Sequence, residues 1–386
     1  MSHEALKRAS EQPLLSPVKL GDLVLDNRVV MAPLTRSRAN RADLTPTPLH
    51  AEYYAQRASA GLIISEGVWI SPSAVGWSDV PGLYSPKQIR SWARVTDAVH
   101  AAGGLIFAQL WHTGALSHPD FFGGAAPLAP SAVNPLQLSV TNDGRKPTAA
   151  PQAMTRDDIR AVVRDYATAA RNALTAGFDG VQLQAGWVYL IGQFLNAKTN
   201  LRSDEYGGSI ENRARLLFEV LDAVAGAIDS RRIGVKTGPS YPETGLFTSN
   251  EGTLPTFDYV IGRLNDYALS HLLLMGAQAD LSTTPVADLQ GDGMFQHFRP
   301  LYRGKIVANV GFDHERGNRV IDDDLADLVA FGRPFIANPD LPARFAAGAA
   351  LNAIDAATIY GGGSAGYTDY PFLDDAERQI RRQQRR

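Results

Sequence analysis

The chain has 386 residues, of which 45% are hydrophobic and 20% are charged, and its formal net charge is −3. This composition is typical of a globular enzyme with a large core, and the small charge gives no electrostatic basis for binding nucleic acid or an anionic membrane. The absence of cysteine excludes disulfides, thiolate metal ligands and cysteine nucleophiles. No apolar run reaches the roughly 18 to 20 residues that a membrane span needs. We therefore expect a cytoplasmic protein.

The first predicted element is a β-hairpin at residues 18–27, where apolar and polar residues alternate around a Gly-Asp turn. It precedes the first long apolar run, so we expect it to cap the N-terminal end of the main domain. We assign that domain to residues 14–371. Residues 1–13 form an N-terminal extension, and residues 372–386 form a basic C-terminal tail, which we interpret as a solvated segment.

Eight short apolar segments follow along the chain, and helix-like segments separate them. A strand that is covered on both faces by helices needs a nearly continuous apolar sequence, and these segments have one. Eight such strands alternating with helices predict an α/β fold, a single (β/α)8 TIM barrel. The segments are residues 29–34, 61–65, 104–109, 180–183, 233–236, 271–275, 305–309 and 328–331.

Helical spacing of apolar residues predicts helices over residues 157–176 and 209–228. Two connections are unusually long, at residues 111–155 and 277–304, and both follow predicted strands. They therefore lie at the C-terminal face, where barrel enzymes build their active sites.

Glycines and an arginine follow the last two predicted strands, namely Gly311, Gly332 and Arg333. Exposed backbone N–H groups and a guanidinium favour a phosphate, and barrels commonly bind phosphate at this position. A metal site is not expected, because the spacing of the candidate ligands Glu66, His112 and His118 is irregular.

Six sequence motifs, in the same order along nearly the whole chain, resemble those of the Old Yellow Enzyme family of flavin-dependent ene-reductases. The most extensive is Ser-Asp-Glu-Tyr-Gly-Gly-Ser-Ile-Glu-Asn-Arg at residues 203–213. The others are at residues 31–36, 109–114, 331–333, 338–341 and 366–371. The resemblance implies FMN as the bound cofactor and NAD(P)H as co-substrate.

By position, the resemblance implies which side chains contact FMN. The residues expected at the isoalloxazine ring are Pro33, Thr35, Gly67 and Gln109. Lys236 occupies the place of a family arginine near N1 and the C2 carbonyl, where a cation stabilises the anionic reduced flavin. Lysine keeps that charge but lacks the planar fork of arginine, so its contact should be less directional. Gly311, Gly332 and Arg333 would hold the phosphate.

The active-site strand departs from the family pattern His-Gly-Ala-Asn(or His)-Gly-Tyr-Leu. Tyr189 remains and would donate the proton, whereas Gln184 and Trp187 replace the pair that polarises the substrate carbonyl. Both replacements carry N–H donors. Loss of one well-placed donor costs about 2.7–4 kcal/mol, so activity on simple enones should be weaker. The remaining expected pocket residues are Trp111, Phe295 and Tyr360.

The expected reaction is hydride transfer from NAD(P)H through flavin N5 to an activated C=C bond, in an α,β-unsaturated carbonyl or a nitroalkene. The partner is therefore a small molecule. Two alternatives remain: a barrel with non-redox isomerase or lyase chemistry, and a flavin-binding protein with weakened ene-reductase activity.

Overall fold

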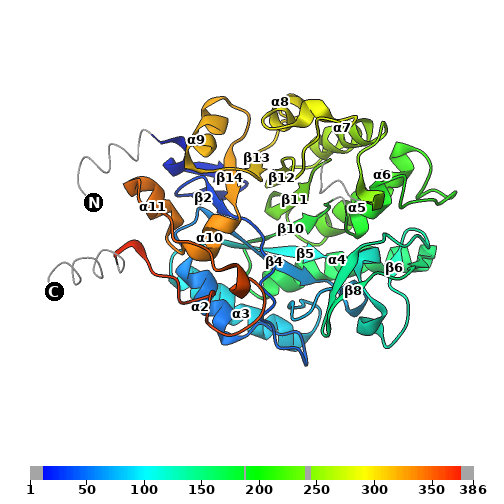
Figure 1. The fold of residues 1–386 in the computed structure, drawn as a ribbon, viewed down its shortest axis with the longest axis horizontal. Coiled ribbons are helices and arrows are strands. Elements are labelled where there is room, and N and C mark those ends of the chain that lie inside the picture. The colour runs from blue at the N-terminus through cyan, green and yellow to red at the C-terminus, as the bar shows by residue number, and fades with distance from the viewer. Residues whose placement is uncertain (1–11, 187, 240–244, 375–386) are drawn as a thin grey trace.

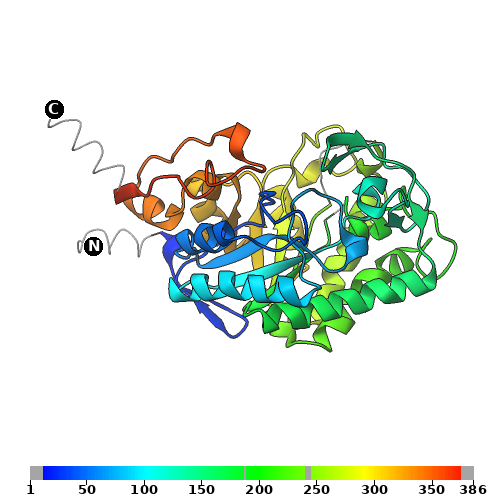
Figure 2. The same ribbon diagram turned by 90° about the horizontal axis from the view of Figure 1, so that it is seen from below.

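The computed structural model describes residues 12–186, 188–239 and 245–374. Eight parallel strands close into a barrel in the order β10-β11-β12-β13-β14-β3-β4-β5, and helices surround it (Figures 1 and 2). The predicted TIM barrel and all eight predicted strands are confirmed. The strands are β3 (Val29–Met31), β4 (Leu62–Trp69), β5 (Ile106–Trp111), β10 (Gly180–Gln184), β11 (Ile233–Thr237), β12 (His271–Met275), β13 (Ile306–Asn309) and β14 (Leu328–Phe331).

The helices form a layer outside the barrel, and a large apolar core fills the space between the two layers. The two helices predicted from apolar spacing are present as α4 (Arg156–Thr175) and α6 (Ile210–Ala225). A side-chain hydroxyl caps the N-terminus of each helix. Thr155 and Ser209 each accept a hydrogen bond from the backbone N–H three residues later. The other helices are α2 (Pro48–Gln56), α3 (Pro86–Ala101), α5 (Leu190–Leu195), α7 (Thr253–Arg263), α8 (Gly293–Phe298), α9 (His314–Asp322), α10 (Arg333–Ala337) and α11 (Leu341–Ala347).

The predicted hairpin consists of β1 (Val18–Leu20) and β2 (Leu23–Leu25), which pair antiparallel. Its apolar side chains belong to the same buried cluster as the residues that line the barrel interior. The turn lies against the loop before β11, because Asp22 pairs with Arg231 at 2.8 Å. That loop is at the N-terminal end of the strands, so the hairpin closes this end as expected.

The long connection after β5 forms a separate small layer. It contains two strand pairs: β6 (Leu128–Ala129) with β9 (Gln152–Ala153), and β7 (Leu138–Thr141) with β8 (Gly144–Pro147). We call residues 128–153 the β6–β9 segment.

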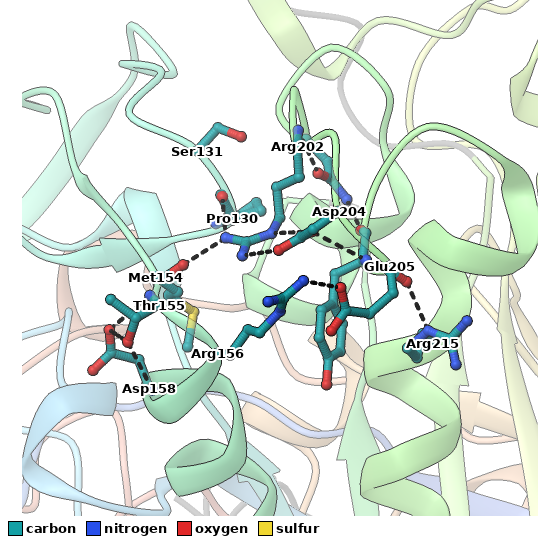
Figure 3. Close-up of polar contacts among 12 residues, drawn as sticks. Pro130, Ser131, Met154, Thr155, Arg156, Asp158, Arg202, Asp204, Glu205 and Arg215 are labelled. Atoms are coloured by element: carbon teal, nitrogen blue, oxygen red, sulfur yellow. Dashed lines mark hydrogen bonds and ion pairs between the residues drawn. The ribbon is translucent and has the colours of Figure 1, made fainter.

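Arg202 ties the β6–β9 segment to the loop after α5 (Figure 3). Its Nη1 donates to the carbonyl oxygens of Pro130 at 3.0 Å and Met154 at 2.6 Å. Its Nε and Nη2 bind the two carboxylate oxygens of Asp204 at 2.9 and 2.6 Å, and this contact lowers the pKa of Asp204. One guanidinium therefore joins two segments that are far apart in the sequence.

Part of the sequence interpretation concerns residues outside the described ranges. These include most of the N-terminal extension and of the basic tail, together with Trp187. Within the described ranges, no helix is both long enough and apolar enough to cross a membrane.

Replacement of Arg202 by alanine should loosen the β6–β9 segment, because two carbonyls and a carboxylate lose their donor. We expect a loss of about 2–3 kcal/mol in the free energy of unfolding. Amide hydrogen exchange should also become faster over residues 128–153. The matched control is Arg160→Ala, since Arg160 pairs with Asp157 at the surface and should contribute less than about 1 kcal/mol. Equal effects of the two variants would contradict this role of Arg202.

Candidate functional site

Three predicted site residues face the barrel interior at its C-terminal end. A Cβ added to Gly234 would lie 2.3 Å from the ring of His271, so position 234 faces inward. Lys236 faces the same way, because side chains alternate along a strand. Gln184 is its direct neighbour in the register of β10 and β11, and Gln109 lies on the other side of β10. The mouth of the barrel thus carries two amides and one ammonium group.

A buried polar chain holds Gln109 in place. Its Nε2 donates to Gln182 Oε1 at 2.7 Å, and Gln182 Nε2 lies 2.9 Å from His271 Nε2. Since Gln182 donates, His271 Nε2 must accept, and its other nitrogen can donate to the hydroxyl of Ser270, 3.2 Å away. This chain leaves one N–H and the carbonyl oxygen of Gln109 for a ligand.

The sequence analysis missed Gln182 and His271. Burial without a charged partner lowers the pKa of His271 to about 3, so the ring is neutral. Both polar residues interrupt apolar strand segments, and that interruption was the signal that could have identified them.

Gln184 retains its donor group. Its Oε1 accepts a hydrogen bond from the backbone N–H of Gly186 at 3.0 Å, while its Nε2 bonds to no other described residue. Tyr189 is the residue before α5, and its ring packs edge-on against Trp111 with 4.9 Å between centroids. The structure therefore brings Tyr189 and Trp111 together beside the end of β10. Trp187 lies outside the described residues.

The glycine at position 67 leaves room for the ring of Trp111. A β-bulge between Ile64 and Gly67 shifts the register of β4 against β5. A Cβ at Gly67 would lie 2.4 Å from the ring of Trp111, which also stacks on Trp69 at 4.5 Å. Only glycine allows this approach. Pro33 and Thr35, at the end of β3, remain half-buried.

Lys236 is the one titratable side chain among these inward-facing residues at the mouth. It is half-buried and makes no hydrogen bond or ion pair with another described residue. Burial lowers its pKa to about 8, because a desolvated ammonium is disfavoured without a compensating carboxylate.

The predicted phosphate residues follow β13 and β14, as expected. Gly311 has a φ of +76°, Gly332 directly precedes α10, and Arg333 is exposed without an ion pair to another described residue. Behind them, the fully buried Arg57 donates to the carbonyl oxygens of Phe335 and Ile336, each at 2.8 Å. Arg57 therefore fixes α10 from its C-terminal half, a role that the sequence did not indicate.

A pocket of about 140 Å³ opens beside Tyr189, under the β7–β8 hairpin. The described residues that line it include no charged side chain. The residues are Gly76, Trp77, Thr113, Leu116, Gln137, Leu138, Ser139, Val140, Val188, Tyr189 and Phe247.

Two further residues were expected to line the substrate pocket. Tyr360 is 53% exposed and packs on Trp77, at the rim of this pocket. Phe295 is fully buried and packs on Phe312 in the core, so its contact with a substrate stays a prediction.

The residues present fit FMN. The ring would meet half-buried backbone at Pro33 and Thr35 and the amide of Gln109, and the unpaired Lys236 offers a cation. The phosphate would meet two glycines and an exposed guanidinium. Among the described residues, no group of three histidine, aspartate or glutamate side chains could hold a metal ion.

The neutral His271 makes the fold sensitive to acid. Below pH 6.5 the unfolded chain protonates this histidine, whereas the native chain does so only near pH 3. Unfolding therefore binds a proton, and native stability falls as the pH decreases through this window. Between pH 8 and pH 5, we expect the parent protein to lose about 2 kcal/mol more than a His271→Gln variant.

Chemical denaturation of the two proteins at each pH measures this difference. Glutamine retains a polar group toward Gln182 and does not titrate, and the difference at pH 8 reports any effect unrelated to protonation. Parallel stability curves from pH 8 to pH 5 would contradict the assignment of a neutral, buried His271.

Known proteins resemble this chain along nearly its whole length. The sequence profile described as "NADH:flavin oxidoreductase / NADH oxidase family" matches residues 13–352. Putative 12-oxophytodienoate reductase 2 of Oryza sativa subsp. japonica is 40% identical over 389 residues, covering 98% of each chain.

Two solved structures superpose closely on this fold. Morphinone reductase in complex with tetrahydroNAD has a TM-score of 0.86 and 44% identity, over 94% of this chain and 98% of that one. The Old Yellow Enzyme homologue from Zymomonas mobilis has a TM-score of 0.87 and 42% identity, over 93% and 99%. Matches of this extent leave one conclusion: the chain is an enzyme of the NADH:flavin oxidoreductase family, to which Old Yellow Enzyme homologues belong.

Proposed function

We propose that this chain uses bound FMN and NAD(P)H to reduce activated C=C bonds, and that residues 14–371 form the FMN-binding unit. One observation carries the proposal: a lysine that is unpaired among the described residues faces the barrel mouth beside Gln109 and Gln184. It lies on the same face as the glycines and Arg333 that suit a phosphate. The bound FMN supplies the hydride-transfer chemistry. The protein supplies binding, orientation and charge stabilisation.

Each group of proposed cofactor-binding residues would contact a different part of FMN. Gln109 has one N–H and one carbonyl oxygen left for the pyrimidine edge of the ring. Lys236 places positive charge where a neutral amide could not, and this charge favours the negative charge that the ring acquires on reduction. Gly311, Gly332 and Arg333 would hold the phosphate through backbone N–H groups and one guanidinium.

On the substrate side, Gln184 donates its free N–H group to the carbonyl oxygen of the alkene. Tyr189 delivers the proton to carbon from its position against Trp111. Trp187 is proposed as the second donor to the oxygen. The described residues that line the pocket beside Tyr189 are uncharged, which favours an uncharged alkene.

The relatives support the nicotinamide and the reaction class. Those from rice and the solved morphinone reductase are named as reductases, and the latter binds tetrahydroNAD. We infer the same type of coenzyme for this chain. Because Gln184 and Trp187 replace the pair expected from the family, we propose a lower rate on simple enones than on more strongly activated alkenes.

The decisive experiment separates the two half-reactions under anaerobic conditions. Native mass spectrometry first measures whether the purified chain binds FMN. NADPH should then bleach the flavin absorbance, and N-ethylmaleimide should restore it, with cyclohexenone acting more slowly. Yellow protein that NADPH does not bleach would favour isomerase or vestigial chemistry. Protein that cannot take up FMN would favour the lyase alternative. No recovery with either alkene would remove the ene-reductase assignment.

A Tyr189→Phe variant tests the proton donor. We expect the alkene-dependent recovery of absorbance to slow by about 10²-fold, since a positioned acid contributes about 10² to 10⁴. Bleaching by NADPH should not change. Tyr267→Phe is the matched control, because Tyr267 lies just before β12, at the opposite end of the barrel, and its recovery rate should stay within about threefold. Similar slowing of both variants would argue against Tyr189 as the donor.

A further inference from the structure

We propose that Lys236 is an imine-forming lysine, whose amine captures a small aldehyde at the barrel mouth when FMN is not bound there. This inference does not rest on the FMN-dependent reaction. It concerns a second chemistry of the same side chain, with a carbonyl compound as ligand.

The amine of Lys236 lies where a small ligand can reach it. Lys236 faces the barrel interior near the C-terminal end of β11, and its side chain remains partly exposed. A small ligand can therefore reach the amine from the mouth. Deeper in the barrel, the interior is filled by Gln182, His271 and the apolar Phe107. The ligand must therefore be small, and its carbonyl carbon must approach the amine from the open side of the barrel.

The amine of Lys236 also lacks a partner among the residues that the structure describes. Among the described lysines, Lys87, Lys146 and Lys305 form ion pairs with aspartates, and Lys198 donates to Thr248. Lys236 makes no such contact with a described residue. Burial lowers its pKa to about 8, and among the described residues no charged neighbour contributes to that shift. At neutral pH it therefore has a much larger fraction of free amine than an ordinary lysine.

Imine formation between the Lys236 amine and an aldehyde needs no oxidant or reductant. The neutral amine nitrogen attacks the carbonyl carbon, forming a C–N bond while the carbonyl oxygen takes a proton. Loss of this oxygen as water, with both amine hydrogens, leaves a C=N bond. Gln184, in register on β10, has a free N–H group that can stabilise the oxygen as charge develops.

The test is reductive trapping of the full-length chain with benzaldehyde and sodium cyanoborohydride at pH 7.4, followed by peptide mass spectrometry. Thermal unfolding first verifies that the chain stays folded after FMN removal. We expect one benzyl group per chain, on Lys236, at a rate at least about tenfold above that of the exposed Lys19. Lys236→Arg keeps the charge but cannot form the imine, so its chain should lose the rapid label and keep the slow labelling of Lys19.

Labelling of Lys236 no faster than Lys19 would overturn the proposal, and so would unfolding of the chain upon FMN removal. Added FMN separates this inference from the proposed function. Rapid labelling that FMN suppresses supports both. Rapid labelling that FMN does not suppress supports the imine-forming lysine and contradicts the placement of the cofactor over Lys236.

Discussion

Closure of eight parallel strands is the constraint on which the rest of this structure depends. Once the barrel closes, every second side chain of each strand is enclosed, and a polar group among them must find its partner inside. The chain Gln109–Gln182–His271 satisfies that demand. This chain holds the Gln109 amide from the neighbouring strand β10. The same hydrogen bonds that satisfy the interior therefore also orient a residue of the candidate site. Interior packing and site geometry therefore cannot vary independently.

Arginines attach the outer segments to this rigid barrel. Arg202 holds the β6–β9 segment, and Arg57 holds α10 beneath the proposed phosphate site. Arg36 is fully buried and donates to the carbonyl oxygens of Ile359 and Gly366, so it fastens the C-terminal segment. In each case one planar guanidinium bonds to several backbone carbonyls that no regular element satisfies. Loops that line the mouth are thereby fixed without forming a second core.

Lys236 links the cofactor proposal to the imine proposal through one physical property. Desolvation without a carboxylate partner makes the site favourable for an approaching negative charge, and it also makes the amine easier to deprotonate. An arginine at this position would give only the first property, since its guanidinium keeps its proton. The lysine thus adds a reactivity that depends on pH.

The sequence by itself determined the barrel, the hairpin and the strand ends, because apolar runs and turn residues are local signals. Its motifs also identified the family, and the profile match and the relatives identify the same one. Only the tertiary structure decided which side chains meet. It buried Phe295, paired Gln109 with Gln182, left Lys236 without a partner among the described residues and placed Arg202 between two distant loops. These outcomes depend on contacts between residues far apart in the chain, and such contacts leave no pattern in any short stretch of sequence.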